Sequence, residues 1–218
     1  NIKKLGNLKF SETTLKNTKK INKNTQKFFD SKKILFGAIS THQNEEIFCT
    51  KIHADLKKKY INGITIIIPR HIHRAPDIKE EIEKIGLKVH LHSSGRKIDN
   101  KTDIYLVDTF GETKLFIKIC KIVFLGGSLI QHGGQNPLES ARLGCKVIHG
   151  PNIDNFLEVY SLLNKNNISS KIRTISQAKD IVKKNINNKF SSKKIIKKLN
   201  SIGNEVLLNN QKEINKYI

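Results

Sequence analysis

Short, continuous apolar runs that alternate with helix-like segments are the feature of this sequence that most restricts its fold. The runs ILFGAIS, ITIIIP and IVFL are apolar at successive positions rather than at every second position. A strand of this kind has to be buried on both faces, as happens in a parallel sheet covered by helices on its two sides. The sequence therefore predicts an α/β fold built on a doubly wound parallel sheet.

The expected strands and helices follow one another along most of the chain. Strands are predicted at 34–40, 64–69, 87–92, 103–108, 122–127, 145–151 and 168–175. Helices are predicted between them, from apolar residues at helical spacing, at 45–60, 76–86, 112–120, 137–144, 154–165 and 176–187. This alternation is typical of one doubly wound domain.

The chain is expected to have three parts. Residues 1–32 are predicted to be a linker and a first helix that follow an N-terminal domain outside this sequence. Residues 33–190 form the predicted Rossmann-like domain, and residues 191–218 a lysine-rich amphipathic helix. Because the chain has no methionine, even at position 1, we expect it to be part of a longer protein.

The chain is strongly basic, with a formal charge of +21 over 218 residues that comes mostly from lysine. Such a charge suits a nucleic acid, an anionic membrane or an anionic substrate. Arginine clusters and stacking aromatics, which RNA-binding surfaces commonly use, are missing from the sequence. We therefore expect no nucleic-acid partner. The alternative, from a different functional class, is a basic, non-catalytic module that binds RNA or an anionic membrane.

The cysteines indicate neither a metal site nor a disulfide framework. Cys49, Cys120 and Cys145 are far apart, and no two form a CxxC pair. Each lies in an apolar segment, so we expect reduced cysteines in the core and a reducing compartment. The sequence also contains no apolar run long enough to cross a bilayer.

Polar clusters follow four of the predicted strands. They are Ser40-Thr41-His42, Pro69-Arg70-His71, Asp108-Thr109-Phe110-Gly111-Glu112 and the stretch from Gly126 to Glu139. Ligands of doubly wound sheets bind beyond the carboxyl ends of the strands. The four clusters therefore predict one binding crevice.

The stretch GGSLIQHGGQNPLE, from Gly126 to Glu139, has the clearest chemistry. Its glycine pairs permit positive φ and a close approach of the backbone to a ligand. Asn136 is a good N-terminal cap and Pro137 suits the first helical position, so the helix start would face a phosphate. Glu139 would accept hydrogen bonds from a ribose diol. The alternative is a glycine-rich turn before a capped structural helix.

The stretch matches neither of the common phosphate-binding signatures. It is not GxGxxG, and no lysine follows Gly134 as GxxxxGK[ST] requires. A dinucleotide-binding site and a P-loop are therefore disfavoured.

Arginine and histidine side chains are expected around the same crevice. Arg70 is suited to clamp a phosphate or carboxylate, with a solvated surface arginine as the alternative. His42, His71, His73 and His132 have no HxxxH spacing and no obvious carboxylate partner, so we predict no metal site. His71 and His73 are suited to help hold an anion.

Taken in order, these motifs resemble the C-terminal half of 3-deoxy-D-manno-octulosonic acid (Kdo) transferases. The resemblance rests on STHQNEE at 40–46, IIIPRH at 66–71, DTFGE at 108–112, FLGGSL with GGQNPLE within 124–139, and GPNIDNF at 150–156. It runs from about Leu5 to at least Tyr160, and the five ordered motifs are far more specific than any one of them.

The resemblance implies a GT-B glycosyltransferase of lipopolysaccharide biosynthesis, in which this half binds the nucleotide sugar CMP-Kdo. It implies inverting, metal-independent transfer of Kdo to a lipid A precursor at the cytoplasmic face of the bacterial inner membrane, without a cofactor. The family's catalytic base lies in the N-terminal half, so no catalytic residue is expected in this chain. A nearer alternative is a GT-B enzyme that uses another nucleotide sugar, such as a UDP-sugar.

The resemblance also assigns the expected site residues. Those implied to bind CMP are Pro69, Arg70, Phe110, Gly111, Glu112, Asn136, Pro137, Leu138 and Glu139. Those expected to contact phosphate or sugar are Thr41, His42, Gly126, Gly127, Ser128, Gly133, Gly134 and Asn155.

Overall fold

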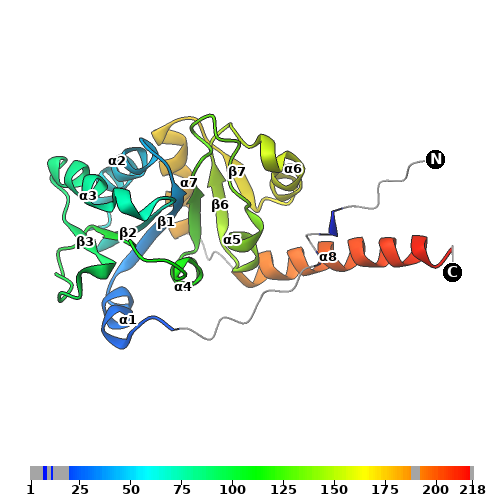
Figure 1. The fold of residues 1–218 in the computed structure, drawn as a ribbon, viewed down its shortest axis with the longest axis horizontal. Helices are drawn as coiled ribbons and strands as arrows, with labels where there is room; N and C mark the ends of the chain where they lie inside the picture. The colour runs from blue at the N-terminus through cyan, green and yellow to red at the C-terminus, as the bar shows by residue number, and fades with distance from the viewer. Residues whose placement is uncertain (1–6, 9–10, 12–19, 188–191, 217–218) are drawn as a thin grey trace.

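A single parallel sheet organises the chain in the computed structural model, which describes residues 7–8, 11, 20–187 and 192–216 (Figure 1). The strand order is β3-β4-β2-β1-β5-β6-β7, and neighbouring strands pair in parallel. The strands are β1 (Lys33–Thr41), β2 (Gly63–Pro69), β3 (Val89–Leu91), β4 (Ile104–Leu106), β5 (Ile122–Leu125), β6 (Lys146–His149) and β7 (Ser169–Lys171). The predicted doubly wound parallel sheet is confirmed.

Helices connect the strands and cover both faces of the sheet. The α-helices are α1 (Lys23–Asp30), α2 (Glu45–Lys57), α3 (Ala75–Lys84), α4 (Thr113–Ile119), α5 (Leu138–Arg142), α6 (Leu157–Lys165), α7 (Ile175–Asn187) and α8 (Ser192–Ile214). Short 3-10 turns are η2 (Ile72–Arg74), η3 (His92–Ser94) and η4 (Asp154–Phe156).

The apolar strands explain why the sheet needs a helix layer on each side. Val123 belongs to a core shared with α1, α4, α5, α6 and α8, whereas the next residue, Phe124, belongs to a core shared with α2, α3 and α7. Because successive side chains of a strand point to opposite faces, two apolar cores require a strand that is apolar throughout.

Helix α1 packs into the domain rather than standing apart from it. Phe28 and Phe29 are buried, and the Phe29 ring lies 4.9 Å from the ring of Tyr105 and 6.2 Å from that of Phe116. Much of the predicted linker, residues 1–6, 9–10 and 12–19, lies outside the described residues, as does the boundary at residue 190.

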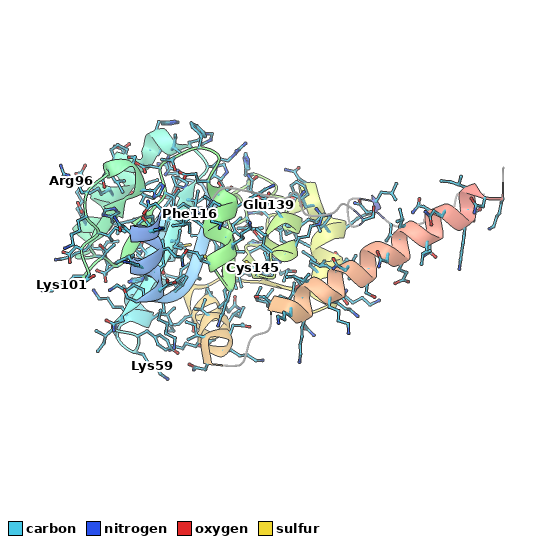
Figure 2. All side chains as sticks on the ribbon, turned by 90° about the horizontal axis from the view of Figure 1, so that it is seen from below. Lys59, Arg96, Lys101, Phe116, Glu139 and Cys145 are labelled. Carbon is cyan, nitrogen blue, oxygen red and sulfur yellow. The ribbon has the colours of Figure 1, made fainter. Side chains whose placement is uncertain are left out.

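Helix α8 packs on the domain at its start and then projects away from it (Figures 1 and 2). Ile195 and Leu199 are buried against the first core, whereas Leu207, Leu208 and Ile214 are exposed. Among the helices of the described residues, none combines the length and the apolar character that a membrane span requires.

Several elements are shorter than predicted. The segment predicted as a strand at 87–92 contains only three strand residues, because β3 is an edge strand and the chain turns into η3 at His92. The helix predicted at 154–165 divides into η4 and α6, with non-helical backbone at Phe156. The helix predicted at 137–144 begins at Leu138.

Candidate functional site

The four polar clusters lie at one edge of the sheet. β4, β2, β1 and β5 are consecutive neighbours, and parallel pairing puts their carboxyl ends on the same side. The backbone N–H group of Arg70, which follows β2, donates to the carbonyl oxygen of Thr41 at the end of β1 over 2.9 Å. The predicted convergence of the clusters on one edge is therefore confirmed.

A cavity of about 300 Å³ opens at this edge, between the ends of β1 and β5 and the helices α4 and α5. It is lined by Ile39, Ser40, Thr113, Ile117, Leu125, Gln135, Asn136, Glu139 and Ser140. Asn136 and Glu139 were predicted to bind the nucleotide, and Ser40 and Gln135 lie within the predicted polar clusters, whereas Thr113 was not singled out. We call this cavity the crevice pocket.

The start of α5 forms one wall of the crevice pocket. The side-chain oxygen of Asn136 accepts a hydrogen bond of 3.0 Å from the backbone N–H group of Leu138, so Asn136 caps the helix as predicted. Pro137 is buried just before the helix, and Leu138 is packed in the core. Leu138 can therefore meet a ligand only through its backbone.

Glu139 is held at the pocket by a residue that the sequence did not single out. The ammonium group of Lys114, on the first turn of α4, lies 2.9 Å from the Glu139 carboxylate, which is labelled in Figure 2. The only sequence signal for Lys114 is its place two residues after the Gly-Glu turn. The pair leaves Glu139 half-exposed, with lone pairs free for hydroxyl donors.

The turn after β4 presents an aromatic ring. Phe110 is 80% exposed, and Gly111 has a φ of +78°, a conformation that favours glycine. Phe110 lies three residues before Thr113, which lines the crevice pocket. An exposed ring beside a polar pocket is suited to stack on a nucleobase.

Glu112 of the same turn is fixed from two sides. The Thr109 hydroxyl donates to it over 2.5 Å, and the Nε2 atom of His92 lies 3.2 Å from it. The Nδ1 atom of His92 in turn lies 2.6 Å from the Tyr105 hydroxyl. His92 is thus a positioning residue for the turn, which sequence reasoning missed because its partners lie on other strands.

The first glycine pair, Gly126-Gly127, packs closely against other residues of the same chain. A Cβ atom on Gly126 would lie only 2.2 Å from the carbonyl oxygen of Ser40, so glycine is required by the contact between the ends of β1 and β5. Ser128 is fully buried, and its hydroxyl donates to Leu125 and accepts from Gly150. The fold itself thus accounts for Gly126 and Ser128, and the contact of these residues with a ligand stays a prediction.

Glu45 accepts hydrogen bonds from three N–H groups of the glycine-rich turn. Its buried carboxylate accepts hydrogen bonds from the backbone of Gly127 (2.7 Å), Ser128 (3.0 Å) and Leu129 (2.9 Å), and also from His42 (2.9 Å). These amides are therefore not free to bind a phosphate. In the sequence, Glu45 is only the first residue of the helix predicted at 45–60.

The second glycine pair lies against the β6–α6 loop. A Cβ atom on Gly133 would lie 2.4 Å from the side chain of Asn155, whose amide donates to the His132 carbonyl oxygen over 3.2 Å. A Cβ atom on Gly134 would lie 3.1 Å from the Asn152 carbonyl oxygen. Asn155 thus fixes the turn in the described structure.

Positive side chains gather at the ends of β1 and β2. Arg74 pairs with the buried carboxylate of Glu46 at 2.9 Å; burial raises the pKa of Glu46, and the bond to Arg74 opposes that rise. Arg70 is exposed and, within the described part of the chain, its guanidinium has no hydrogen-bond or ion-pair partner. Burial, then the nearby His132 and the other cations, lowers the pKa of His42 to about 4.

Two further observations bound the chemistry of the site. A larger cavity of about 870 Å³ lies between α1 and the turn after β3, but none of the predicted site residues lines it. Among the described residues, no three His, Cys, Asp or Glu side chains are grouped so that they could hold a metal ion.

Known proteins resemble this chain in sequence. No protein-family model matches it. The 3-deoxy-D-manno-octulosonic acid transferase of Haemophilus influenzae is 30% identical over 174 residues, which cover 80% of this chain and 40% of that protein. The enzyme of the same name from Rickettsia prowazekii is 35% identical over 175 residues, 78% of this chain and 36% of that protein. The chain thus spans about two fifths of the length of these relatives.

A solved structure resembles the fold over nearly its whole length. The C-terminal CMP-Kdo binding domain of WaaA from Acinetobacter baumannii superimposes with a TM-score of 0.73 at 25% identity, covering 84% of this chain and 94% of that domain. The fold is that of the C-terminal domain of a GT-B glycosyltransferase. Within that class, the chain belongs to the Kdo transferase family.

Proposed function

We propose that this chain is the donor-binding domain of a Kdo transferase and holds CMP-Kdo in the crevice pocket. The observation that carries the proposal is the pairing of Glu139 with Lys114 at a pocket lined by Thr113, which lies three residues after the exposed Phe110. Similarity to a CMP-Kdo binding domain supports the identity of the donor.

Each part of the nucleotide has a matching group. Phe110 offers a stacking surface for the cytosine, and the turn held by Glu112 offers backbone groups to its edge. Glu139 offers two acceptor oxygens to the ribose diol. Arg70, which has no partner in the described residues, is suited to the phosphate.

The residues of this chain would act on the leaving group. When the sugar is transferred, CMP departs as a phosphate anion, and a positive group that is already in place stabilises the charge as it develops. Arg70 is the group proposed for this task. We propose that the transfer is inverting and needs no metal or cofactor, and that the base which activates the acceptor belongs to the N-terminal domain.

The remaining partners follow from the proposed family activity. The acceptor is a lipid A precursor, and the enzyme works at the cytoplasmic face of the inner membrane. The charge of +21 supports this placement, because lysine-rich surfaces are attracted to anionic headgroups.

Titration calorimetry with CMP, UMP and UDP tests the proposal. We expect CMP to bind best, and binding to persist when the salt concentration is raised from 50 to about 200 mM, since a neutral base and a ribose carry part of the recognition. A preference for UDP would favour another nucleotide sugar. Equal binding of all three, lost by orders of magnitude at higher salt, would favour the basic RNA- or membrane-binding module.

A further inference from the structure

Three histidines meet beside the crevice pocket, and the nucleotide does not account for them. The histidine cluster consists of His42, His71 and His132, with Arg70 at its edge. We propose that this cluster is an oxyanion subsite that receives the carboxylate of the acidic sugar carried by the donor. The inference rests on the proposed function, because the sugar reaches the cluster only when its nucleotide fills the crevice pocket.

The cluster is built from three separate segments. His42 follows β1, His71 follows β2, and His132 lies in the glycine-rich turn after β5. The His42 ring centroid lies 4.3 Å from that of His132 and 5.9 Å from that of His71. The His42 ring is therefore in contact range of both other imidazoles at the carboxyl edge of the sheet.

His42 supplies the independent sign that a ligand is missing. Its side chain is only 8% exposed, yet its Nε2 atom has no hydrogen-bond partner among the described residues. Its backbone is fixed by the bond to Glu45. A buried polar atom without a partner is unfavourable, so a partner from outside the chain is expected at this point.

The surrounding charges favour an anion as that partner. The two nearby carboxylates are already occupied, Glu45 by backbone N–H groups and Glu46 by Arg74. The cluster therefore has N–H donors, with the Arg70 guanidinium at its edge, and no free carboxylate beside it in the part of the chain that the structure describes. His42 is held neutral by burial and by the neighbouring His132, His71 and Arg70, and an oxyanion would relieve that repulsion.

The position of the cluster favours the sugar over the phosphate. The crevice pocket lies on the face of the sheet that α4 and α5 cover. His42 begins the loop to α2, and α2 covers the opposite face. Gly126 and Ser40 lie between the two, in backbone contact. A ligand in the crevice pocket reaches the cluster only through a group that extends past this contact. In CMP-Kdo, the sugar that follows the phosphate is such a group.

Three N–H groups of the glycine-rich turn are not available to the carboxylate. Those of Gly127, Ser128 and Leu129 are bound to Glu45. The histidine side chains are therefore the donors that we propose for the oxyanion. The imidazoles can donate to it through their N–H groups.

The test compares cytidine, CMP and CMP-Kdo on the 218-residue chain and on its His71→Gln/His132→Gln double variant. Both histidines are exposed, so we expect the variant to fold, and thermal melting checks this. We expect the variant to lose about tenfold in affinity for CMP-Kdo while its affinity for CMP stays within about twofold. His90→Gln, on the far edge of the sheet, is the matched control and should change neither.

The other outcomes separate the two proposals. An equal loss for CMP and CMP-Kdo, with cytidine unchanged, would assign the cluster to the phosphate and overturn the carboxylate subsite. Unchanged affinities for all three ligands would overturn the subsite and leave the CMP site standing. If the unaltered chain binds CMP no better than cytidine or UMP, the proposed function itself fails.

Discussion

The carboxylate of Glu45 and the backbone N–H group of Gly127 are joined by a hydrogen bond of 2.7 Å, although the residues lie 82 positions apart in the chain. The bond ties the first turn of α2 to the turn after β5. Ser128 and Leu129 donate to the same carboxylate, so three consecutive N–H groups converge on one buried side chain. Glu45 therefore shapes the edge of the sheet on which the donor site depends.

Replacing Glu45 with glutamine should destabilise the domain. The amide would keep one acceptor oxygen but place an NH₂ group against backbone N–H donors, leaving buried donors unpaired. We expect a loss of about 2 to 4 kcal/mol in the free energy of unfolding, measured by urea denaturation. Glu81→Gln, exposed on α3, should change stability by less than about 0.5 kcal/mol. Equal stability of the two variants would contradict the role given to Glu45.

Alanine at Gly126 should be tolerated poorly. Its Cβ atom would lie 2.2 Å from the Ser40 carbonyl oxygen and 2.6 Å from the Thr41 Cα atom, so the ends of β1 and β5 would have to separate. We expect a destabilisation of about 3 kcal/mol or more in thermal or urea unfolding. The control is Gly95→Ala, where φ is +62° but a Cβ atom meets nothing, with an expected cost of about 1 kcal/mol. Similar costs at both positions would show that the contact is not tight.

Mild acid should weaken the fold through two buried histidines. Burial lowers the pKa of His42 and of His149 from 6.5 to about 4. Between those values the unfolded chain binds more protons than the folded one, so the free energy of unfolding falls as the pH drops from 6.5 towards 4. The full effect is up to about 3 kcal/mol for each residue.

Urea unfolding at pH 7, 5.5 and 4.5 measures this dependence. His149→Gln removes one of the two titrating groups, and its stability should change less steeply with pH across the same window. The pKa of Asp103 is about 2, so this residue takes up its proton in the folded chain only below the pH range of the measurement. Constant stability between pH 7 and 4.5 would contradict the assignment of these two histidines.

Removing the aromatic ring of Phe110 should weaken CMP binding without weakening the fold. The side chain is 80% exposed, so its loss leaves no cavity, but it removes the proposed stacking surface. We expect Phe110→Ala to lose about tenfold in CMP affinity by calorimetry. Ile61 is also 80% exposed, and Ile61→Ala serves as the control for an exposed apolar truncation. Unaltered CMP affinity in Phe110→Ala would exclude stacking at this turn.

The sheet and the place of the site were predictable because both depend on local patterns. Continuous apolar runs such as ITIII show strands buried on two faces, and polar residues just after those runs must share the carboxyl edge of a parallel sheet. The cap at Asn136 was predictable for the same reason, since its partner is two residues away.

The contacts that complete the site were not predictable, because they join distant segments. Lys114 meets Glu139 from another helix, and His92 meets Glu112 from the turn after β3. The sequence also did not reveal that the backbone of Ser40 lies so close to Gly126 that the contact itself requires glycine. Such contacts depend on how the loops pack against one another.

The affinity of the chain for CMP before and after the change Glu139→Gln tests the central claim most directly. The substitution keeps the size of the side chain but halves its acceptor oxygens and removes the charge that pairs with Lys114. The account predicts that CMP binds the unaltered chain and that Glu139→Gln lowers its affinity about tenfold or more, while Glu81→Gln leaves it unchanged. CMP binding of equal strength in all three proteins would contradict the placement of the nucleotide in the crevice pocket.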